Sequence, residues 1–288
     1  MIGRSKPGEA TKEPTAFIKK PVRSSDDSAT PELSSLRDFA VDLAWNAGQI
    51  SLQYFETTIE AKTKEDGTPV TIADRKTEEY LRRELIAAFP DDGLIGEELG
   101  HIPGSSGRVW VIDPIDGTES FMRGVPLFGL LMALTVAGDP LLGIMHFPAL
   151  GETFSAYRGG GCSRNGQRVE VSKTSDLAEA VVTTTAIPTQ SSPGTPIEPL
   201  LASVRLGRTW GDCYGYSMVA GGRADVMVDP FIKAWDIAAA LPVIEEAGGR
   251  LTDLAGRRTI WSGHAVATNG LLHDAVLDRL RSGGSPHR

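Results

Sequence analysis

The 288-residue sequence has little cysteine: Cys162 and Cys213 stand alone, and no Cys-x-x-Cys pair occurs. Two isolated cysteines do not provide the disulfide framework of small secreted proteins, so a reducing, cytoplasmic setting is expected. The five histidines show no metal-ligand spacing and therefore do not suggest a histidine-based metal site.

Long apolar runs and an excess of positive charge are also missing. No run approaches the roughly 18 apolar residues that a membrane-spanning helix needs. The formal net charge is −8, whereas nucleic-acid binding normally requires a basic face. We therefore expect neither a membrane span nor a nucleic-acid partner. An acidic protein that bound phosphate would need local positive charge, for which metal ions are the obvious source.

Regular hydrophobic periodicity is present over most of the chain after residue 30. Residues 1–30 lack it and contain no hydrophobic signal core, so we expect a disordered tail there. The expected helices span 31–55, 71–89, 214–221, 237–247, with a bend at Pro242, and 271–281. The expected strands span 94–96, 109–112, 127–136, 141–147, 153–157, 169–171, 181–184 and 208–210. The glycine-rich segment 159–166 is expected to connect a hairpin. This mixture indicates an α+β fold built in layers.

The chemistry is most concentrated in the segment 113–118, Asp-Pro-Ile-Asp-Gly-Thr, which directly follows a buried-strand pattern. Asp113 and Asp116 offer carboxylate oxygens, the ligands that hard cations such as Mg²⁺ prefer. Free N–H groups at Gly117, Thr118 and Glu119 could begin a helical turn that holds phosphate. An ordinary aspartate-rich turn is the alternative, since Asp-Pro and Asp-Gly are common turn dipeptides.

Other acidic residues have equally plain alternatives when each is considered alone. Glu97 follows Gly96 at a strand end and could belong to a solvated face. Asp236 begins a helix and could be an N-cap. Asp74, three residues after Thr71, fits a capping box.

Taken together and in order, these segments resemble the inositol monophosphatase superfamily of metal-dependent phosphatases. The resemblance covers about residues 36–280 and rests on Gly-Glu-Glu at 96–98, Asp-Pro-Ile-Asp-Gly-Thr at 113–118 and Trp-Asp-Ile-Ala-Ala at 235–239. The last segment leads into Glu-Glu-Ala-Gly-Gly at 245–249, also a family feature. The resemblance implies a layered α/β/α/β/α sandwich of the inositol monophosphatase and fructose-1,6-bisphosphatase type.

The resemblance also implies roles for individual residues. The implied Mg²⁺ ligands, for two or three ions, are Glu97, Asp113, the carbonyl of Ile115, Asp116 and Asp236. Asp74 and Thr118 would orient a water activated by the metal, with Glu97 beside a third, weaker ion. The backbone N–H groups of Gly117 and Thr118 would hold the phosphate. Glu119 stands where other residue types often follow, which leaves its side-chain contribution open.

Within the superfamily, the region before the last aspartate forms the leaving-group pocket. Here the Gly-Asp-x-x-Gly-Tyr run at 211–216 resembles the histidinol-phosphate phosphatase branch. Asp212 and Asp229 suit a leaving group that carries an ammonium and an imidazole, although Asp212 could instead cap a helix. L-Histidinol phosphate, a histidine-biosynthesis intermediate, is the favoured substrate. Inositol 1-phosphate or other sugar phosphates are the alternative.

The implied organisation has two subdomains with the site between them. Residues 31–175 would carry the metal site and residues 176–284 the leaving-group pocket. Family resemblance further implies a homodimer. An interaction protein with incidental phosphatase activity is the hypothesis from a different functional class.

Overall fold

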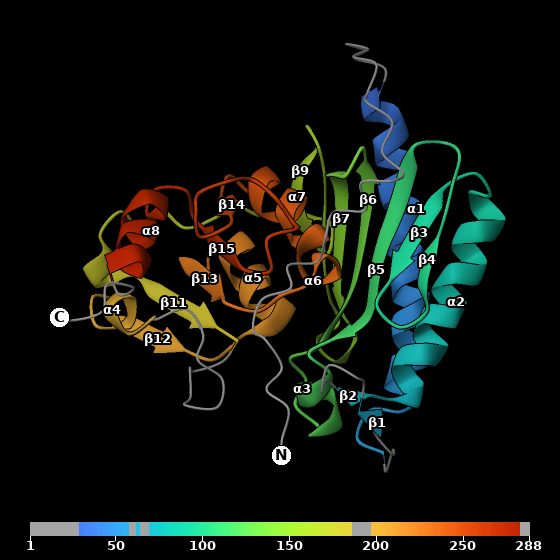
Figure 1. Cartoon of the computed structure of the whole chain (residues 1–288), viewed down its shortest axis with the longest axis horizontal. Helices are drawn as coiled ribbons and strands as arrows, with labels where there is room; N and C mark the ends of the chain where they lie inside the picture. Colours follow the sequence, from blue (N-terminus) through green and yellow to red (C-terminus); the bar gives the residue numbers. More distant parts are fainter. Residues whose placement is uncertain (1–28, 58–61, 64–68, 186–196, 283–288) are drawn as a thin grey trace, which may run out of the picture.

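The computed structural model describes residues 29–57, 62–63, 69–185 and 197–282 (Figure 1). The expected tail, 1–30, lies outside these ranges except for its last two residues, which begin helix α1 (Ala29–Leu52). None of the described helices combines the length and the apolar composition needed to cross a bilayer.

The larger of the two main sheets has eight strands in the order β10-β9-β8-β7-β6-β5-β3-β4. Its neighbouring strands are antiparallel, except that β3 and β5 are parallel. The strands are β3 (Gly93–Gly96), β4 (Gly100–Ile102), β5 (Arg108–Asp116), β6 (Gly129–Val136), β7 (Asp139–Phe147), β8 (Glu152–Tyr157), β9 (Gly161–Arg164) and β10 (Gln167–Arg168). A short separate hairpin joins β1 (Lys62–Thr63) to β2 (Pro69–Val70).

The smaller sheet has five strands in the order β12-β11-β13-β15-β14. Strand β11 runs parallel to both β12 and β13, while β15 is antiparallel to β13 and β14. The strands are β11 (Val181–Thr184), β12 (Leu206–Arg208), β13 (Val226–Asp229), β14 (Arg250–Thr252) and β15 (Ala265–Thr268). The carboxyl ends of β11 and β13 therefore lie at the same edge of this sheet.

The helices form three layers around the two sheets (Figure 1). Helices α1 and α2 (Ile72–Ala88) cover the outer face of the larger sheet. Helices α5 (Asp212–Ala220), α6 (Ala234–Ala238) and α7 (Ala240–Glu246) lie between the sheets, and α4 (Glu198–Leu201) and α8 (His273–Ser282) pack beside the smaller one. The short α3 (Thr118–Met122) and the 3₁₀ turns Pro148–Leu150 and Leu177–Glu179 complete the chain. This arrangement confirms the expected α/β/α/β/α fold.

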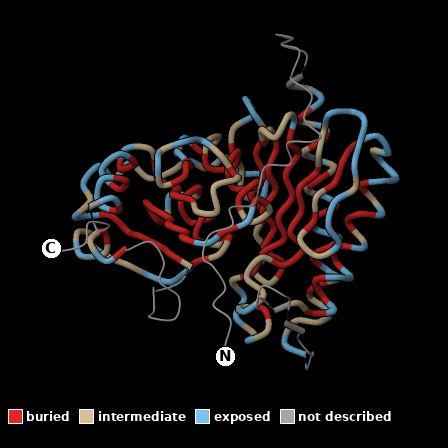
Figure 2. The backbone as a smooth tube through the Cα atoms, viewed as in Figure 1, coloured by how far each residue is buried: buried red, intermediate tan, exposed pale blue. Residues whose placement is uncertain are grey.

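Strand β6 shows why the larger sheet sits in the middle of the molecule. Side chains alternate between the two faces of a strand. Leu130 and Met132 pack in the cluster beneath α1 and α2. Leu131 and Ala133 pack on the opposite face against the middle helices. Both faces are therefore covered, which explains the nearly continuous hydrophobic run in this segment and the buried strands in Figure 2.

Two local expectations were wrong, those for 169–171 and 237–247, and the one for 159–166 was incomplete. Residues 169–171 are not a strand, and the sheet instead ends at β10. The segment 159–166 contains strand β9 as well as the turn at Asn165. Residues 237–247 form parts of two helices that meet at Ala239. The junction lies three residues before Pro242, which occupies the first turn of α7, where the backbone N–H groups have no partner within the helix.

Candidate active site

A β-bulge near the end of β5 brings two aspartates to one face of the larger sheet. Asp113 and Asp116 are three positions apart, and in a regular strand they would point to opposite faces. Asp113 pairs with Leu131 and Asp116 pairs with Gly129, so β5 holds one more residue than β6 over this stretch. The extra residue restores the parity and turns both carboxylates toward the middle layer.

Asp236 from α6 completes an acidic triad with these two residues. One carboxylate oxygen from each of the three lies within 4.8 Å of the others. The backbone N–H of Lys233 donates to Asp236 Oδ2 over 2.6 Å, and the N–H of Cys213 donates to Asp116 Oδ2. Backbone donors at the starts of α6 and α5 thus fix two of the three carboxylates.

Within the described part of the chain, no Lys or Arg forms an ion pair with the three carboxylates of this cluster. Burial raises the pKa of Asp113 well above its ordinary value, and the negative charges of Glu97, Asp116 and Asp236 raise it further. The pKa of Asp116 is also raised well above its ordinary value, mainly by burial and next by the negative charge of Asp212. Carboxylate oxygens held close together despite their burial and mutual repulsion suit a hard divalent cation, so the donor set fits Mg²⁺. A bound cation would neutralise the repulsion.

The segment after the bulge turns sharply into α3. Gly117 adopts φ 83°. Its backbone lies close to Asp212: a Cβ added at Gly117 would be 3.2 Å from Asp212 Oδ2. No side chain caps α3 through Gly117, so N–H groups at the helix start are left for a ligand. Thr118 Oγ1 donates to the carbonyl of Ile115 over 3.1 Å, which fixes the hydroxyl next to the bulge.

Asp74 serves as a cap and retains one unused oxygen. It is fully buried at the start of α2, where its Oδ2 accepts the N–H of Thr71 over 2.8 Å. Among the described residues, its other oxygen, Oδ1, has no hydrogen-bond partner. Burial raises the pKa of Asp74 to about 6, against the lowering effect of the Thr71 hydrogen bonds and with a contribution from Glu97. The capping interpretation and the catalytic one are therefore compatible.

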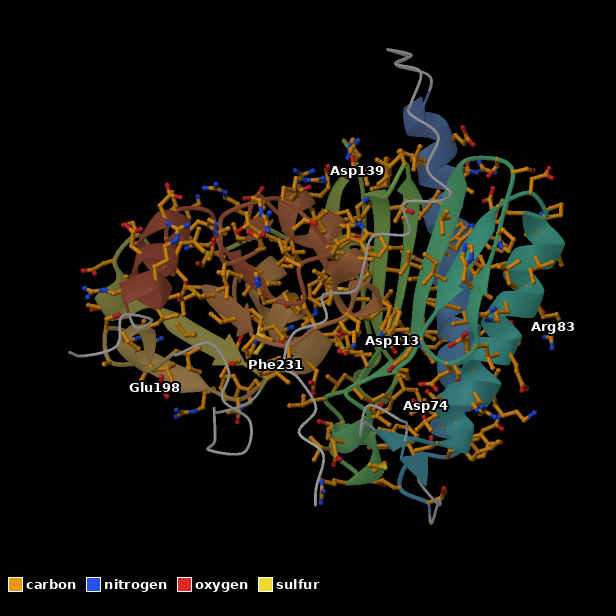
Figure 3. The ribbon with its side chains drawn as sticks, in the orientation of Figure 1. Asp74, Arg83, Asp113, Asp139, Glu198 and Phe231 are labelled. Carbon is orange, nitrogen blue, oxygen red and sulfur yellow. The ribbon has the colours of Figure 1, made fainter. Side chains whose placement is uncertain are left out.

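Glu97 belongs to the same acidic region as Asp74 and the triad. It follows β3 directly, and its N–H donates to the carbonyl of Ile112 in the neighbouring β5 over 3.3 Å. Its charge raises the pKa of both Asp74 and Asp113, so the three carboxyl groups share one region. Figure 3 shows Asp74 and Asp113 labelled near one another at the same end of the larger sheet.

Asp212, at the start of α5, and Asp229, at the end of β13, face the same region. Thr185 follows β11 and links them: it accepts the N–H of Asp212 over 3.0 Å and donates to Asp229 Oδ2 over 3.1 Å. Burial raises the pKa of Asp212 to about 6. Burial and the charge of Asp212 raise that of Asp229 to about 7. No Lys or Arg within the described ranges forms an ion pair with either carboxylate.

Glu119 is placed differently from the other residues proposed to contact substrate. Its side chain is exposed and forms an ion pair with Arg123, one turn later in α3, over 3.1 Å. Its backbone N–H remains at the start of α3, beside that of Thr118. The structure thus brings the expected residues to one place, with Glu119 facing it through its backbone alone.

Sequence reasoning missed the groups that hold these carboxylates. Thr185 and the N–H of Cys213 have no motif of their own, and their roles depend on contacts across the fold. Glu78 was also missed. It stands four residues after Asp74, a spacing that places two side chains on one face of a helix and could have drawn attention to it.

Comparisons with known proteins agree with this geometry. The family model described as "Inositol monophosphatase family" matches residues 32–284. A histidinol-phosphatase from Chlorobaculum parvum is 45% identical over 88% of this chain and 98% of its own length. A histidinol-phosphatase from Mycobacterium tuberculosis is 40% identical over 85% of this chain and 97% of its own.

A solved structure gives the same result for the fold. The Thermotoga maritima IMPase superposes with a TM-score of 0.78 at 33% identity, over 85% of this chain and 96% of that one. The matches span nearly all of the region that contains both sheets and the acidic cluster. The chain therefore belongs to the inositol monophosphatase family of phosphoric monoester hydrolases.

Proposed function

We propose that this enzyme hydrolyses L-histidinol phosphate to L-histidinol and phosphate in a Mg²⁺-dependent reaction of histidine biosynthesis. The observation that carries the proposal is the pair of carboxylates Asp212 and Asp229 beside the acidic triad, linked through Thr185. The two relatives at 45% and 40% identity are named histidinol-phosphatases, which supports the same substrate.

The metal site would be built from the bulge and its neighbours. Glu97, Asp113, the carbonyl of Ile115, Asp116 and Asp236 would hold two or three Mg²⁺ ions. When bound, Mg²⁺ would neutralise these carboxylates and polarise the phosphate oxygens. The remaining steps belong to side chains and backbone groups of the protein.

Asp74 and Thr118 are suited to orient the attacking water. Asp74 Oδ1 is free to accept a proton from water, while Oδ2 is held by Thr71 and keeps the carboxyl group in place. A pKa of about 6 leaves Asp74 ionised at neutral pH yet more basic than an ordinary aspartate, which favours general-base catalysis. The Thr118 hydroxyl, anchored to the Ile115 carbonyl, can accept a second hydrogen bond from the same water.

Different groups would hold the phosphate and the leaving group, on either side of the phosphorus–oxygen bond that breaks. Backbone N–H groups of Gly117, Thr118 and Glu119 at the start of α3 would bind the phosphate oxygens. Asp212 and Asp229 would pair with the ammonium of histidinol. An ammonium would also offset the burial that raises the pKa values of both carboxyl groups.

Inositol 1-phosphate, or a broader set of sugar phosphates, is the second candidate substrate. The 33% identical Thermotoga IMPase supports it, since that relative matches over nearly the same length. An uncharged polyol would gain hydrogen bonds from Asp212 but no charge pairing, so the two substrates should respond differently to changes there.

The wider proposal rests on family resemblance and on composition. It includes a homodimer, a cytoplasmic location, no nucleic-acid or membrane partner, and a division into subdomains at 31–175 and 176–284.

The test of the substrate is a comparison of kcat/KM for L-histidinol phosphate and myo-inositol 1-phosphate in wild type and Asp212→Ala. A charge-assisted hydrogen bond contributes about 1.5–3 kcal/mol, so we expect kcat/KM for histidinol phosphate to fall about ten- to a hundredfold. The value for inositol phosphate should fall much less. Glu198→Ala, an exposed acid on α4 far from the cluster (Figure 3), is the matched control.

A wild type that prefers inositol 1-phosphate would contradict the substrate and leave the hydrolytic mechanism in place. An equal fall for both substrates in Asp212→Ala would show that Asp212 supports the site without reading the charge of the leaving group.

A further inference from the structure

The turn that carries Glu97 is bound to helix α2 by one buried carboxylate, Glu78. Glu78 is fully buried. Its Oε2 accepts the N–H of Glu98 over 2.7 Å, and its Oε1 accepts the N–H of Leu99 over 3.0 Å. These two donors belong to the turn between β3 and β4, directly after Glu97. A side chain on α2 thereby satisfies the backbone of the loop that holds a proposed metal ligand.

A buried arginine reinforces the same turn. Arg82 Nε donates to Glu78 Oε1 over 2.7 Å, with the two residues one helical turn apart. A second nitrogen of the Arg82 guanidinium donates to the carbonyl of Gly100, at the far side of the turn. Glu78 and Arg82 together contact the turn at both ends, so it cannot shift relative to α2 without breaking buried, charge-assisted hydrogen bonds.

The packing at Gly96 shows how closely the two parts fit. A Cβ at Gly96 would lie 2.1 Å from Glu78 Oε1 and 2.9 Å from an Arg82 guanidinium nitrogen. Real contacts of that kind do not occur, so a glycine before Glu97 is what allows the Glu78 carboxylate to approach the backbone. The Gly-Glu-Glu segment and Glu78 therefore depend on each other.

Helix α2 also carries Asp74, four residues before Glu78 on the same helical face. The same rigid element thus presents the free oxygen of Asp74 and fixes the loop of Glu97. A buried ion pair is weak evidence for stability, because desolvation offsets most of the attraction. Its placement between two functional carboxylates points to a different role.

We propose that Glu78, supported by Arg82, is a positioning residue that sets the Glu97 carboxylate against Asp74 and Asp113 for Mg²⁺ binding. This inference rests on the proposed metal site. Partners that orient ligands in this way change metal affinity by about 10–100-fold when they are removed. Glu78→Gln keeps the size of the side chain but replaces one acceptor with a donor that faces N–H groups.

The experiment is a calorimetric titration of metal-free protein with Mg²⁺, together with the Mg²⁺ dependence of phosphate release. In Glu78→Gln we expect the Kd for Mg²⁺ and the half-activating Mg²⁺ concentration to rise at least about tenfold. KM for substrate at saturating Mg²⁺ should stay near the wild-type value. Glu79→Gln is the matched control, since Glu79 is the next residue on α2, is half-exposed and pairs with Lys76.

A Glu78→Gln protein with a lowered Tm and an unchanged Kd for Mg²⁺ would overturn the inference and leave Glu78 a purely structural residue. If that variant does not fold, Arg82→Lys takes its place in the same titration. It keeps the charge but loses the second donor to Gly100, and an unchanged Kd would again overturn the inference. A wild type that binds no Mg²⁺ would instead overturn the proposed metal site, and this inference with it.

Discussion

The two oxygens of the Asp74 carboxylate have different surroundings, and this separates its structural contribution from its chemical one. Oδ2 accepts from Thr71 and caps α2, whereas Oδ1 has no partner among the described residues. An asparagine can keep the cap through its own oxygen and would replace the free oxygen with an amide nitrogen. Stability and activity should therefore respond separately to a change at this position.

We predict that Asp74→Asn lowers kcat by about 10²–10⁴-fold, the usual contribution of a general base. The free energy of unfolding should change by no more than about 1 kcal/mol, because the amide oxygen of Asn can still accept the N–H of Thr71, the N-cap residue of α2. Steady-state kinetics and urea unfolding measure the two quantities. A variant that loses stability and activity together, with kcat restored by cooling, would assign Asp74 to the fold alone.

At the scale of single residues, the sequence predicted the acidic groups but not how they are held. Asp113, Asp116 and Asp236 stand in recognisable segments, and the structure places them together. Thr185 could not be found, because its two hydrogen bonds depend on how β11 lies beside β13 and the start of α5. Contacts of this kind arise from topology and have no local pattern in the sequence.

The turn from β5 into α3 is the element that connects the metal ligands with the phosphate-binding N–H groups. Gly117 lies at its centre with φ 83°, a conformation that costs a residue with a side chain about 1–2 kcal/mol. A side chain there would also press on Asp212 Oδ2 and on the carbonyl of Leu127, each 3.2 Å from an added Cβ.

We predict that Gly117→Ala lowers stability by about 1–2 kcal/mol and also reduces kcat/KM about tenfold or more, because the turn must move. Gly107→Ala is the matched control, since Gly107 has φ 85° and open space where a Cβ would lie. That control should lose similar stability and keep wild-type activity. Thermal unfolding and kinetics on both variants decide whether the effect is strain alone.

At the scale of elements, long periodic segments were predicted well and short ones unevenly: β11 was predicted at its observed bounds, whereas other short strands were not. Helices α1 and α2 were placed to within a few residues, because each repeats its apolar face over several turns. Strands β13 and β15 were missed. Each has four residues, all buried by neighbouring elements, so neither shows the alternation that marks a half-exposed strand.

The bulge in β5 could not be predicted either, although it is decisive for the site. The spacing of Asp113 and Asp116 alone would place them on opposite faces of a regular strand. The register shift against β6 depends on how the chain continues into Gly129 across the sheet. The metal-binding prediction was therefore based on residue types and on the family resemblance, and the structure supplies the geometry.

For the whole molecule, the carboxyl groups make stability depend on pH and on metal. The pKa values of Asp74 and Asp212 are raised to about 6 and that of Asp229 to about 7, above the ordinary value of 3.8. Between the ordinary pKa of 3.8 and the raised values of about 6 to about 7, these three carboxyl groups bind more protons in the folded protein than in the unfolded chain. Stability from these groups is therefore present at low pH and is lost as pH rises through about 6–7.

We predict that the Tm of metal-free protein falls between about pH 5 and pH 8, and that excess Mg²⁺ raises Tm by an amount that grows over the same range. The metal competes with protons for the same oxygens, so its effect is largest when they are ionised. Scanning calorimetry in chelator and in Mg²⁺ measures both trends. A metal-free Tm that is constant or rises over this range would contradict the account of the cluster.

The most direct test of the central claim is phosphate release from L-histidinol phosphate by wild type and Asp113→Asn, with excess Mg²⁺ and after chelation. We predict that wild-type release falls to background in chelator and returns when Mg²⁺ is restored. Asp113→Asn, shown to be folded by its Tm, should be at least about 10³-fold slower, since the metal contributes several kcal/mol to the transition state. Release that persists in chelator, or an Asp113→Asn variant that keeps the wild-type rate, would show that the acidic cluster does not perform the hydrolysis.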